Sequence, residues 1–124
     1  MAKRKSKKTA KRKRRLRKTP RKSAAKLPKN AVTLIVILRA REGQELLLEA
    51  ALRALVAPSR REGGCFTFDL HRSADAPGVY LLHEVWASRE HHRVHTQTRH
   101  FLRWSAGKDA LLASRESNFW KQIA

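Results

Sequence analysis

The sequence predicts one small α+β domain with the ferredoxin-like βαββαβ order, preceded by a basic tail. Charge divides the chain into two parts, because residues 1–30 hold 16 of the 29 Lys and Arg residues and none of the 10 Asp and Glu residues. Hydrophobic periodicity alternates along residues 31–124 between the two-residue repeat of strands and the helical repeat. All eight aromatic residues lie in this second part. We therefore assign residues 1–30 to a tail and residues 31–124 to a single domain.

The tail is too highly charged to fold by itself. Residues 3–18 contain only two apolar side chains, Ala10 and Leu16, so burial cannot offset the entropy of ordering the segment, and we expect it to be disordered. Basic side chains neutralise nucleic-acid phosphates, and the densest run comprises Lys11, Arg12, Lys13, Arg14 and Arg15. A nuclear-import patch or an extension without a function would have the same composition.

The domain is expected to begin with a strand and a helix. Residues 32–40 (VTLIVILRA) are rich in β-branched residues and apolar at consecutive positions, which predicts a strand covered on both faces. Residues 41–43 form a turn. Residues 44–57 place leucines at helical spacing, which predicts an amphipathic helix, and Pro58 is expected near its end.

Two strands joined by a turn are expected next. Residues 65–72 (CFTFDLHR) alternate in polarity, so one face of this strand should carry Phe66, Phe68 and Leu70. Residues 73–78 have the composition of a turn. Residues 79–87 (VYLLHEVWA) alternate in the same way, so one face should carry Tyr80, Leu82, Glu84 and Trp86. Together they predict an antiparallel hairpin.

A helix and a last strand should complete the domain. Ser88 suits the N-cap position of a helix through residues 91–96, which is expected to bend or resume near Thr98 and to end at Gly107. Residues 108–115 are expected to form a short helical connection. Residues 117–123 (SNFWKQI) are expected to form the last strand.

The sheet predicted in this way has two apolar faces, but its two helices can cover only one of them. The simplest cover for the other face is the same face of a second subunit. We therefore expect a two-fold homodimer with the sheets packed face to face, a dimeric α+β barrel.

Several classes of protein are excluded. The longest apolar run, residues 31–38, is too short for a membrane span, which needs about 20 residues, and the N-terminus lacks the apolar segment of a secretory signal. The single cysteine, Cys65, cannot form an internal disulfide and is expected to be a small buried residue, which favours a reducing, cytoplasmic location. Glycine motifs for nucleotides are missing, so no nucleotide or nicotinamide cofactor is expected.

Four histidines within ten residues raise the question of a metal. His95 can share one side of a helix with either His91 or His92, and such a pair can bind an ion. A third ligand is not placed with them, because Glu90 does not complete the HExxH pattern of zinc proteases. We therefore expect no metal site.

The most specific feature of the sequence is a string of polar and aromatic residues, Glu84, Trp86, Ser88, His95, His100 and Phe101. Together with the Gly-Gly-Cys turn at residues 63–65 and Leu-His-Arg at residues 70–72, this string resembles the antibiotic biosynthesis monooxygenase-like family, over about residues 31–121. The resemblance implies a small dimeric ferredoxin-like protein. Some members of the family oxygenate phenols, anthrones or quinols with O₂ and use neither a metal nor a flavin.

The resemblance implies a cofactor-independent monooxygenase that acts on such a small molecule. His95 or His100 would remove a proton or hold the resulting anion, and Trp86 would be an aromatic wall of the site. The other expected pocket residues are Phe101, Glu84, His71 and His83.

Other functions compete with this one. A heme-degrading branch of the family has an Asn on the first strand and a His late in the second helix. This chain has Val36 or Ile37 and Ser105 at those places, so heme degradation is not expected. A nucleic-acid-associated dimer, docked through the tail, and a domain that binds an aromatic molecule without converting it both stay open.

Overall fold

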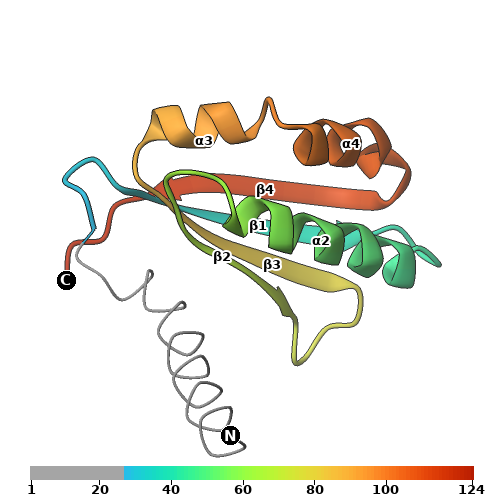
Figure 1. The fold of residues 1–124 in the computed structure, drawn as a ribbon. Helices are drawn as coiled ribbons and strands as arrows, with labels where there is room; N and C mark the ends of the chain where they lie inside the picture. Colours follow the sequence, from blue (N-terminus) through green and yellow to red (C-terminus); the bar gives the residue numbers. More distant parts are fainter. Residues whose placement is uncertain (1–26) are drawn as a thin grey trace, which may run out of the picture.

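The computed structural model describes residues 27–124, which form a single layered unit (Figure 1). Residues 1–26, which make up most of the predicted tail, lie outside this range. The elements in chain order are β1 (Val32–Ala40), α2 (Glu45–Arg60), β2 (Cys65–Arg72), β3 (Val79–Trp86), α3 (Arg89–His95), α4 (Arg99–Gly107), the 3₁₀ turn η2 (Lys108–Ala110) and β4 (Leu112–Trp120).

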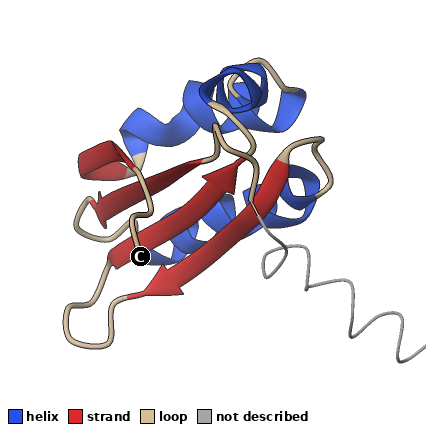
Figure 2. Cartoon of the chain, turned by 90° about the vertical axis from the view of Figure 1, so that its left-hand side faces the viewer, coloured by secondary structure: helices blue, strands red, loops and turns tan. Residues whose placement is uncertain are grey.

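The four strands form one antiparallel sheet in the order β2-β3-β1-β4. Strands β1 and β3 therefore lie in the centre, and β2 and β4 form the edges. The helices gather on one face of this sheet, which Figure 2 shows from a second direction. This is the ferredoxin-like arrangement, so the predicted fold class is confirmed.

The hydrophobic core lies between the sheet and the helices. Every second residue of β1 points toward the helices, and these residues are Leu34, Val36 and Leu38, all nearly inaccessible. Helix α2 buries the leucine stripe that its spacing predicted, Leu48, Leu52 and Leu55. The predicted inward face of β3 is also confirmed, because Tyr80, Leu82, Glu84 and Trp86 are all buried.

Two elements of the first half differ from the prediction. Helix α2 continues three residues past the predicted end at residue 57, to Arg60, so Pro58 lies near its end as expected, and Ser59 in the last turn is completely buried. The strict alternation expected for β2 fails at its start, where a bulge falls between Cys65 and Thr67. The extra residue leaves Cys65 and Phe68 buried and Phe66 only half-buried. Cys65 is thus the small buried residue that was expected.

The last strand begins earlier than predicted. Only residues 108–110 are helical, and β4 then runs over Leu112–Trp120 rather than over residues 117–123. The expected helical connection over residues 108–115 and the boundaries of the last strand were therefore wrong. The first half of β4 is a polar edge strand, exposed at residues 113–118, and it is held by antiparallel pairing with β1.

The predicted interruption of the second helix near Thr98 is confirmed. Ser88 caps α3, and its Oγ accepts a hydrogen bond from the backbone N–H of His91 at 3.2 Å. Thr98 caps α4 in the same way and accepts from the N–H of Phe101 at 3.3 Å. Two short helices therefore follow one another across a sharp joint at residues 96–98.

The sheet face opposite the helices carries side chains that no described helix covers. Ile35, Ile37 and Leu81 are half-buried there, and Trp120 is 58% exposed. Among the described residues, no helix is long and apolar enough to cross a membrane.

Candidate functional site

A cavity of about 80 Å³ lies between the sheet and the joint of α3 and α4. Its floor is apolar and comes from β1, β2 and β3, including Val36, Phe68 and Leu82. Polar side chains enter from four different elements: Glu84 from β3, His92 and His95 from α3, Thr96 from the joint and Arg115 from β4. Phe101 and Trp104 of α4 close the far side. The cavity thus combines an apolar floor with a few converging polar groups, which is typical of small-molecule sites.

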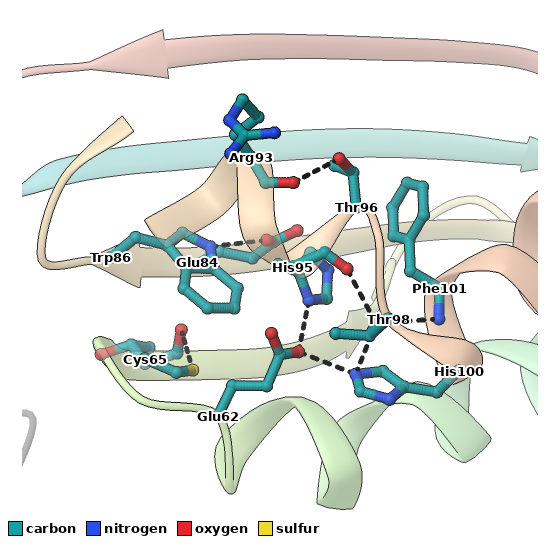
Figure 3. Close-up of polar contacts among 11 residues, drawn as sticks. Glu62, Cys65, Glu84, Trp86, Arg93, His95, Thr96, Thr98, His100 and Phe101 are labelled. Atoms are coloured by element: carbon teal, nitrogen blue, oxygen red, sulfur yellow. Dashed lines mark hydrogen bonds and ion pairs between the residues drawn. The ribbon is translucent and has the colours of Figure 1, made fainter. Parts of the chain in front are cut away.

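Glu84 is the most unusual of these groups, because it is a carboxyl that is only 3% exposed. Its Oε1 accepts a hydrogen bond of 2.9 Å from Nε1 of Trp86, two residues further along β3 (Figure 3). Burial raises the pKa of Glu84 to about 7, against the opposing effects of Trp86 and of the positive charge of Arg115. Near neutral pH, Glu84 therefore exists as a mixture of acid and carboxylate.

His95 is held by a carboxylate outside its own helix. Its Nδ1 lies 2.6 Å from Oε2 of Glu62, a residue in the turn after α2, and its ring packs against Trp86 with 4.6 Å between the ring centroids. Burial lowers the pKa of His95, although Glu62 acts in the opposite direction. The contact is thus best described as a neutral imidazole that donates Nδ1–H to Glu62. Among residues 27–124, the other ring nitrogen, Nε2, has no hydrogen-bond partner, and His95 lines the cavity.

His100 approaches the same carboxylate from the other side. Its Nε2 lies 2.7 Å from Oε2 of Glu62 and 3.2 Å from Oγ1 of Thr98. The Thr98 hydroxyl also donates to the backbone oxygen of His95 at 2.7 Å. Figure 3 shows Glu62 joined to both imidazoles. Glu62, His95 and His100 together form what we call the Glu62 cluster.

Two further side chains set the electrostatics of the cavity. Burial lowers the pKa of His92 to about 4, and the positive charge of Arg115 acts in the same direction. His92 is therefore neutral at physiological pH. Arg115 is exposed and has no ion-pair partner among the described residues, so it is available to an anion near the cavity.

The structure brings together some of the predicted site residues and separates others. Glu84, His95 and Phe101 line the cavity. Trp86 does not line it as a wall but is completely buried behind it and supports Glu84 and His95. His100 reaches Glu62 from behind the cavity and does not line it.

His71 and His83 lie apart from this group. His83 alternates with the inward-facing Glu84 on β3, and His71 is exposed near the end of β2. Residue 69 pairs with His83 and residue 71 pairs with Leu81, so these residues lie on the sheet face that has no helices. Neither histidine can therefore reach the cavity.

Sequence reasoning did not identify Glu62, His92 as a cavity residue, or Arg115. Glu62 is 33 residues before His95 in the chain, so no local spacing connects them. Glu62 also supplies the third possible metal ligand, a carboxylate, which the histidine-rich segment does not contain. One ligand atom from each of Glu62, His95 and His100 lies within 4.8 Å of the others.

The arrangement is suited to moving protons beside an apolar cavity floor. His95 and His92 are neutral bases, Glu84 can give or take a proton near neutral pH, and Glu62 holds His95 in one tautomer. Perturbed groups of this kind, gathered around a cavity, are typical of active sites.

Several known proteins are similar to this domain. Residues 31–107 match the family described as antibiotic biosynthesis monooxygenase. The Mycobacterium tuberculosis protein named "Putative monooxygenase Rv0793" is 35% identical over 81 residues, which make up 65% of this chain and 79% of that protein. Among solved structures, PA3566 from Pseudomonas aeruginosa has 38% identity and a TM-score of 0.75, and the match covers 77% of this chain and 97% of PA3566. The structure of Rv0793 has a TM-score of 0.73 and 29% identity, and the match covers 77% of this chain and 97% of that structure's chain.

Proposed function

The chain belongs to the antibiotic biosynthesis monooxygenase family, and from this premise we propose that it oxidises a phenolic, quinol or anthrone-type small molecule with O₂ and without a cofactor. One observation carries the proposal: an apolar cavity holds a neutral histidine, His95, whose Nδ1 is occupied by Glu62 and whose Nε2 is left for a ligand. Such a histidine is a general base of fixed orientation.

The chemistry needs only a base, an apolar cavity and O₂. His95 Nε2 would take the proton of an acidic O–H or C–H group, and the resulting anion would pass an electron to O₂ directly. For an anthrone, the CH₂ group becomes C=O, one oxygen atom enters the product and the other leaves as water. The CH₂ group gives up two hydrogens and four electrons, which reduce O₂ to the carbonyl oxygen and water, so the step balances without a flavin or a metal.

Two groups would stabilise the anion formed in this step. The protonated form of Glu84 can donate a hydrogen bond to a developing oxyanion, and a pKa of about 7 makes this form available. The Arg115 guanidinium supplies positive charge at the edge of the cavity. Trp86 acts through Glu84, which it orients from behind.

The size of the cavity limits the substrate. At about 80 Å³ it is smaller than the range of about 300–1,000 Å³ that is usual for ligand pockets. A substrate of two or three rings therefore requires the joint of α3 and α4 to move outward. The outer sides of both helices leave room for such a movement, because Val94 and Leu102 are about half exposed.

The test is O₂ consumption by the full chain, treated with a chelator, with a panel of quinols and anthrones. Boiled protein gives the rate of autoxidation. We expect uptake above this rate, and a loss of about 100-fold or more in His95→Asn, because general bases contribute that much. His91→Ala, which changes an exposed histidine of the same helix, should keep the rate.

Other results would contradict the proposal. Equal rates in His95→Asn and the wild type would show that His95 is not the base. A compound that binds but is recovered unchanged by mass spectrometry would favour a binding domain without catalysis.

We also propose that the chain forms a homodimer through the sheet face opposite the helices. The half-buried Ile35, Ile37 and Leu81 and the exposed Trp120 support this, because isolated domains rarely leave a contiguous apolar face open. Sedimentation should give a dimer for the wild type and for Leu102→Asp, on the outer side of α4. Ile37→Asp should give a monomer, and a dimer of unchanged affinity in that variant would contradict the proposal.

The separation of charge along the chain favours a second function, in which the tail binds nucleic acid. Residues 1–30 hold 16 basic residues and no acidic ones, and contacts with phosphates give affinity that falls steeply with salt. Replacing Lys11, Arg12, Lys13, Arg14 and Arg15 by Gln in the full chain should reduce the salt slope by about 0.9 for each phosphate that the tail no longer neutralises. An unchanged slope would exclude this function for the tail.

A further inference from the structure

The Glu62 cluster gathers three ligand atoms from three separate segments of the chain. Glu62 lies in the turn after α2, His95 ends α3 and His100 lies in the first turn of α4. The two imidazole nitrogens lie 2.6 and 2.7 Å from one carboxylate oxygen, Oε2, and all three atoms lie within 4.8 Å of one another. Two histidines and one carboxylate, drawn together in this way, form a donor set suited to a divalent transition metal.

The hydrogen bonds of the Glu62 cluster use only one of the two carboxylate oxygens of Glu62. Both contacts go to Oε2, and among the described residues no side chain or backbone group binds the second carboxylate oxygen, Oε1. The side chains of Glu62 and His95 are only 12% and 3% exposed. Rings of Phe68, Trp86 and Phe101 pack around His95, so the cluster has the apolar shell common around metal sites.

The charges and geometry fit a divalent cation. When they coordinate a metal, one carboxylate and two imidazoles together carry a single negative charge, which a divalent ion more than balances. Zinc binds nitrogen and oxygen at about 2.0–2.2 Å, so ligands at tetrahedral angles lie about 3.3–3.5 Å apart. The present contacts of 2.6 and 2.7 Å would have to open by less than about 1 Å, and the two imidazole nitrogens, which lie within 4.8 Å of each other, would have to close by at most about 1.5 Å.

We propose that Glu62, His95 and His100 form a divalent-cation site of the zinc type, with three protein ligands and an open position. Binding would use the lone pair of Nδ1 of His95 and of Nε2 of His100. An imidazole that binds a metal through one ring nitrogen carries its proton on the other. The site goes beyond the proposed oxygenation, which uses no metal.

This proposal links the metal to the cavity. With an ion on Nδ1, the proton of His95 lies on Nε2, which is the atom that would otherwise accept a proton from the substrate. The loaded site would therefore lack its base, and the metal would act as an inhibitor of the metal-free reaction.

Cobalt(II) titration of the full chain tests the site. The protein is prepared without a histidine tag, stripped with a chelator and followed by the visible absorption of bound Co²⁺, with no substrate present. We expect one Co²⁺ per chain, displaced by Zn²⁺. Glu62→Gln should weaken binding by at least about 100-fold, since loss of even an outer contact of a metal site costs about 10–100-fold. His91→Ala should bind as the wild type does.

A second measurement does not depend on variants. In the wild type, Zn²⁺ should shift the imidazole ¹⁵N signals of His95 and His100 and leave those of His71 and His83 unchanged. If the circular dichroism spectrum of Glu62→Gln shows that this variant does not fold, the ¹⁵N measurement and the binding of Co²⁺ by His100→Asn decide the question.

The proposal is overturned if Co²⁺ gives no saturable spectrum, or if Glu62→Gln binds it with unchanged affinity. Oxygen uptake without metal binding would contradict the metal site but not the proposed function. Metal binding without oxygen uptake by the stripped protein would support the metal site and contradict the proposed function.

Discussion

The buried carboxyl of Glu84 should make the stability of the protein fall as the pH rises. Burial raises its pKa from 4.5 to about 7, against the hydrogen bond from Trp86 and the charge of Arg115, while the charge of Glu62 adds to the rise. His92 also lines this cavity and is neutral. The folded state binds the proton of Glu84 more tightly than the unfolded chain does. The stabilisation from Glu84 is therefore complete below the pKa of the unfolded chain and is lost as the pH rises through the pKa of the folded state.

The size of this effect follows from the shift. A rise from 4.5 to about 7 corresponds to about 3 kcal/mol, of which about 2–3 kcal/mol falls between pH 5 and pH 8. Glu84→Gln keeps the shape of the side chain and an oxygen for Nε1 of Trp86, but it cannot ionise. The variant should therefore lose about 2–3 kcal/mol less stability than the wild type between these two pH values.

Urea unfolding of both proteins at pH 5 and pH 8, followed by tryptophan fluorescence at one protein concentration, measures this difference. Other groups that titrate are common to both proteins and cancel. Glu116→Gln, which changes an exposed carboxylate on β4, should show the same pH dependence as the wild type. Equal pH dependence in Glu84→Gln and the wild type, within about 0.5 kcal/mol, would refute the reasoning.

Two further predictions concern the backbone and the surface. Gly64 has a φ of +81°, and a Cβ there would lie 2.3 Å from the ring of His91, so Gly64→Ala should destabilise the protein by more than about 1–2 kcal/mol in urea unfolding. Gly63→Ala, where a Cβ meets open space, should cost much less, and equal costs would contradict this account. The pKa of Glu49 is lowered to about 2, chiefly by its hydrogen bond with Arg72, so it stabilises the fold above its ordinary pKa of 4.5 and less as the pH falls through about 2. Melting temperatures of Glu49→Gln should therefore depend less on pH than those of the wild type between pH 5 and pH 2, and parallel curves would show that the ion pair contributes nothing.

The fold could be predicted because most of its elements carry their own hydrophobic pattern. Strand β1 and the hairpin of β2 and β3 have their predicted starts, since alternation or β-branched runs mark them directly. Strand β4 lacks such a pattern over its first half, where Ser114 and Arg115 are exposed. Its strand structure depends on pairing with β1, and no local sequence pattern predicts this pairing.

The site was only partly predictable for a related reason. His95 and Glu84 stand out locally, but Glu62 joins them through the packing of a turn 33 residues earlier. The position of His83, in contrast, was within reach of the sequence. Adjacent residues of a strand point to opposite faces, so His83 and Glu84 could not both line one pocket.

The joint between α3 and α4 has a consequence for how the Glu62 cluster is built. Consecutive residues of an α-helix are rotated by about 100°, so two residues five positions apart on one unbroken helix point about 140° away from each other. His95 and His100 have this separation, yet both reach the same oxygen of Glu62. They can do so because the chain leaves the helix at Thr96 and starts a new one after Thr98. Substitutions that favour one continuous helix here would strengthen the local structure and, at the same time, pull the two imidazoles apart.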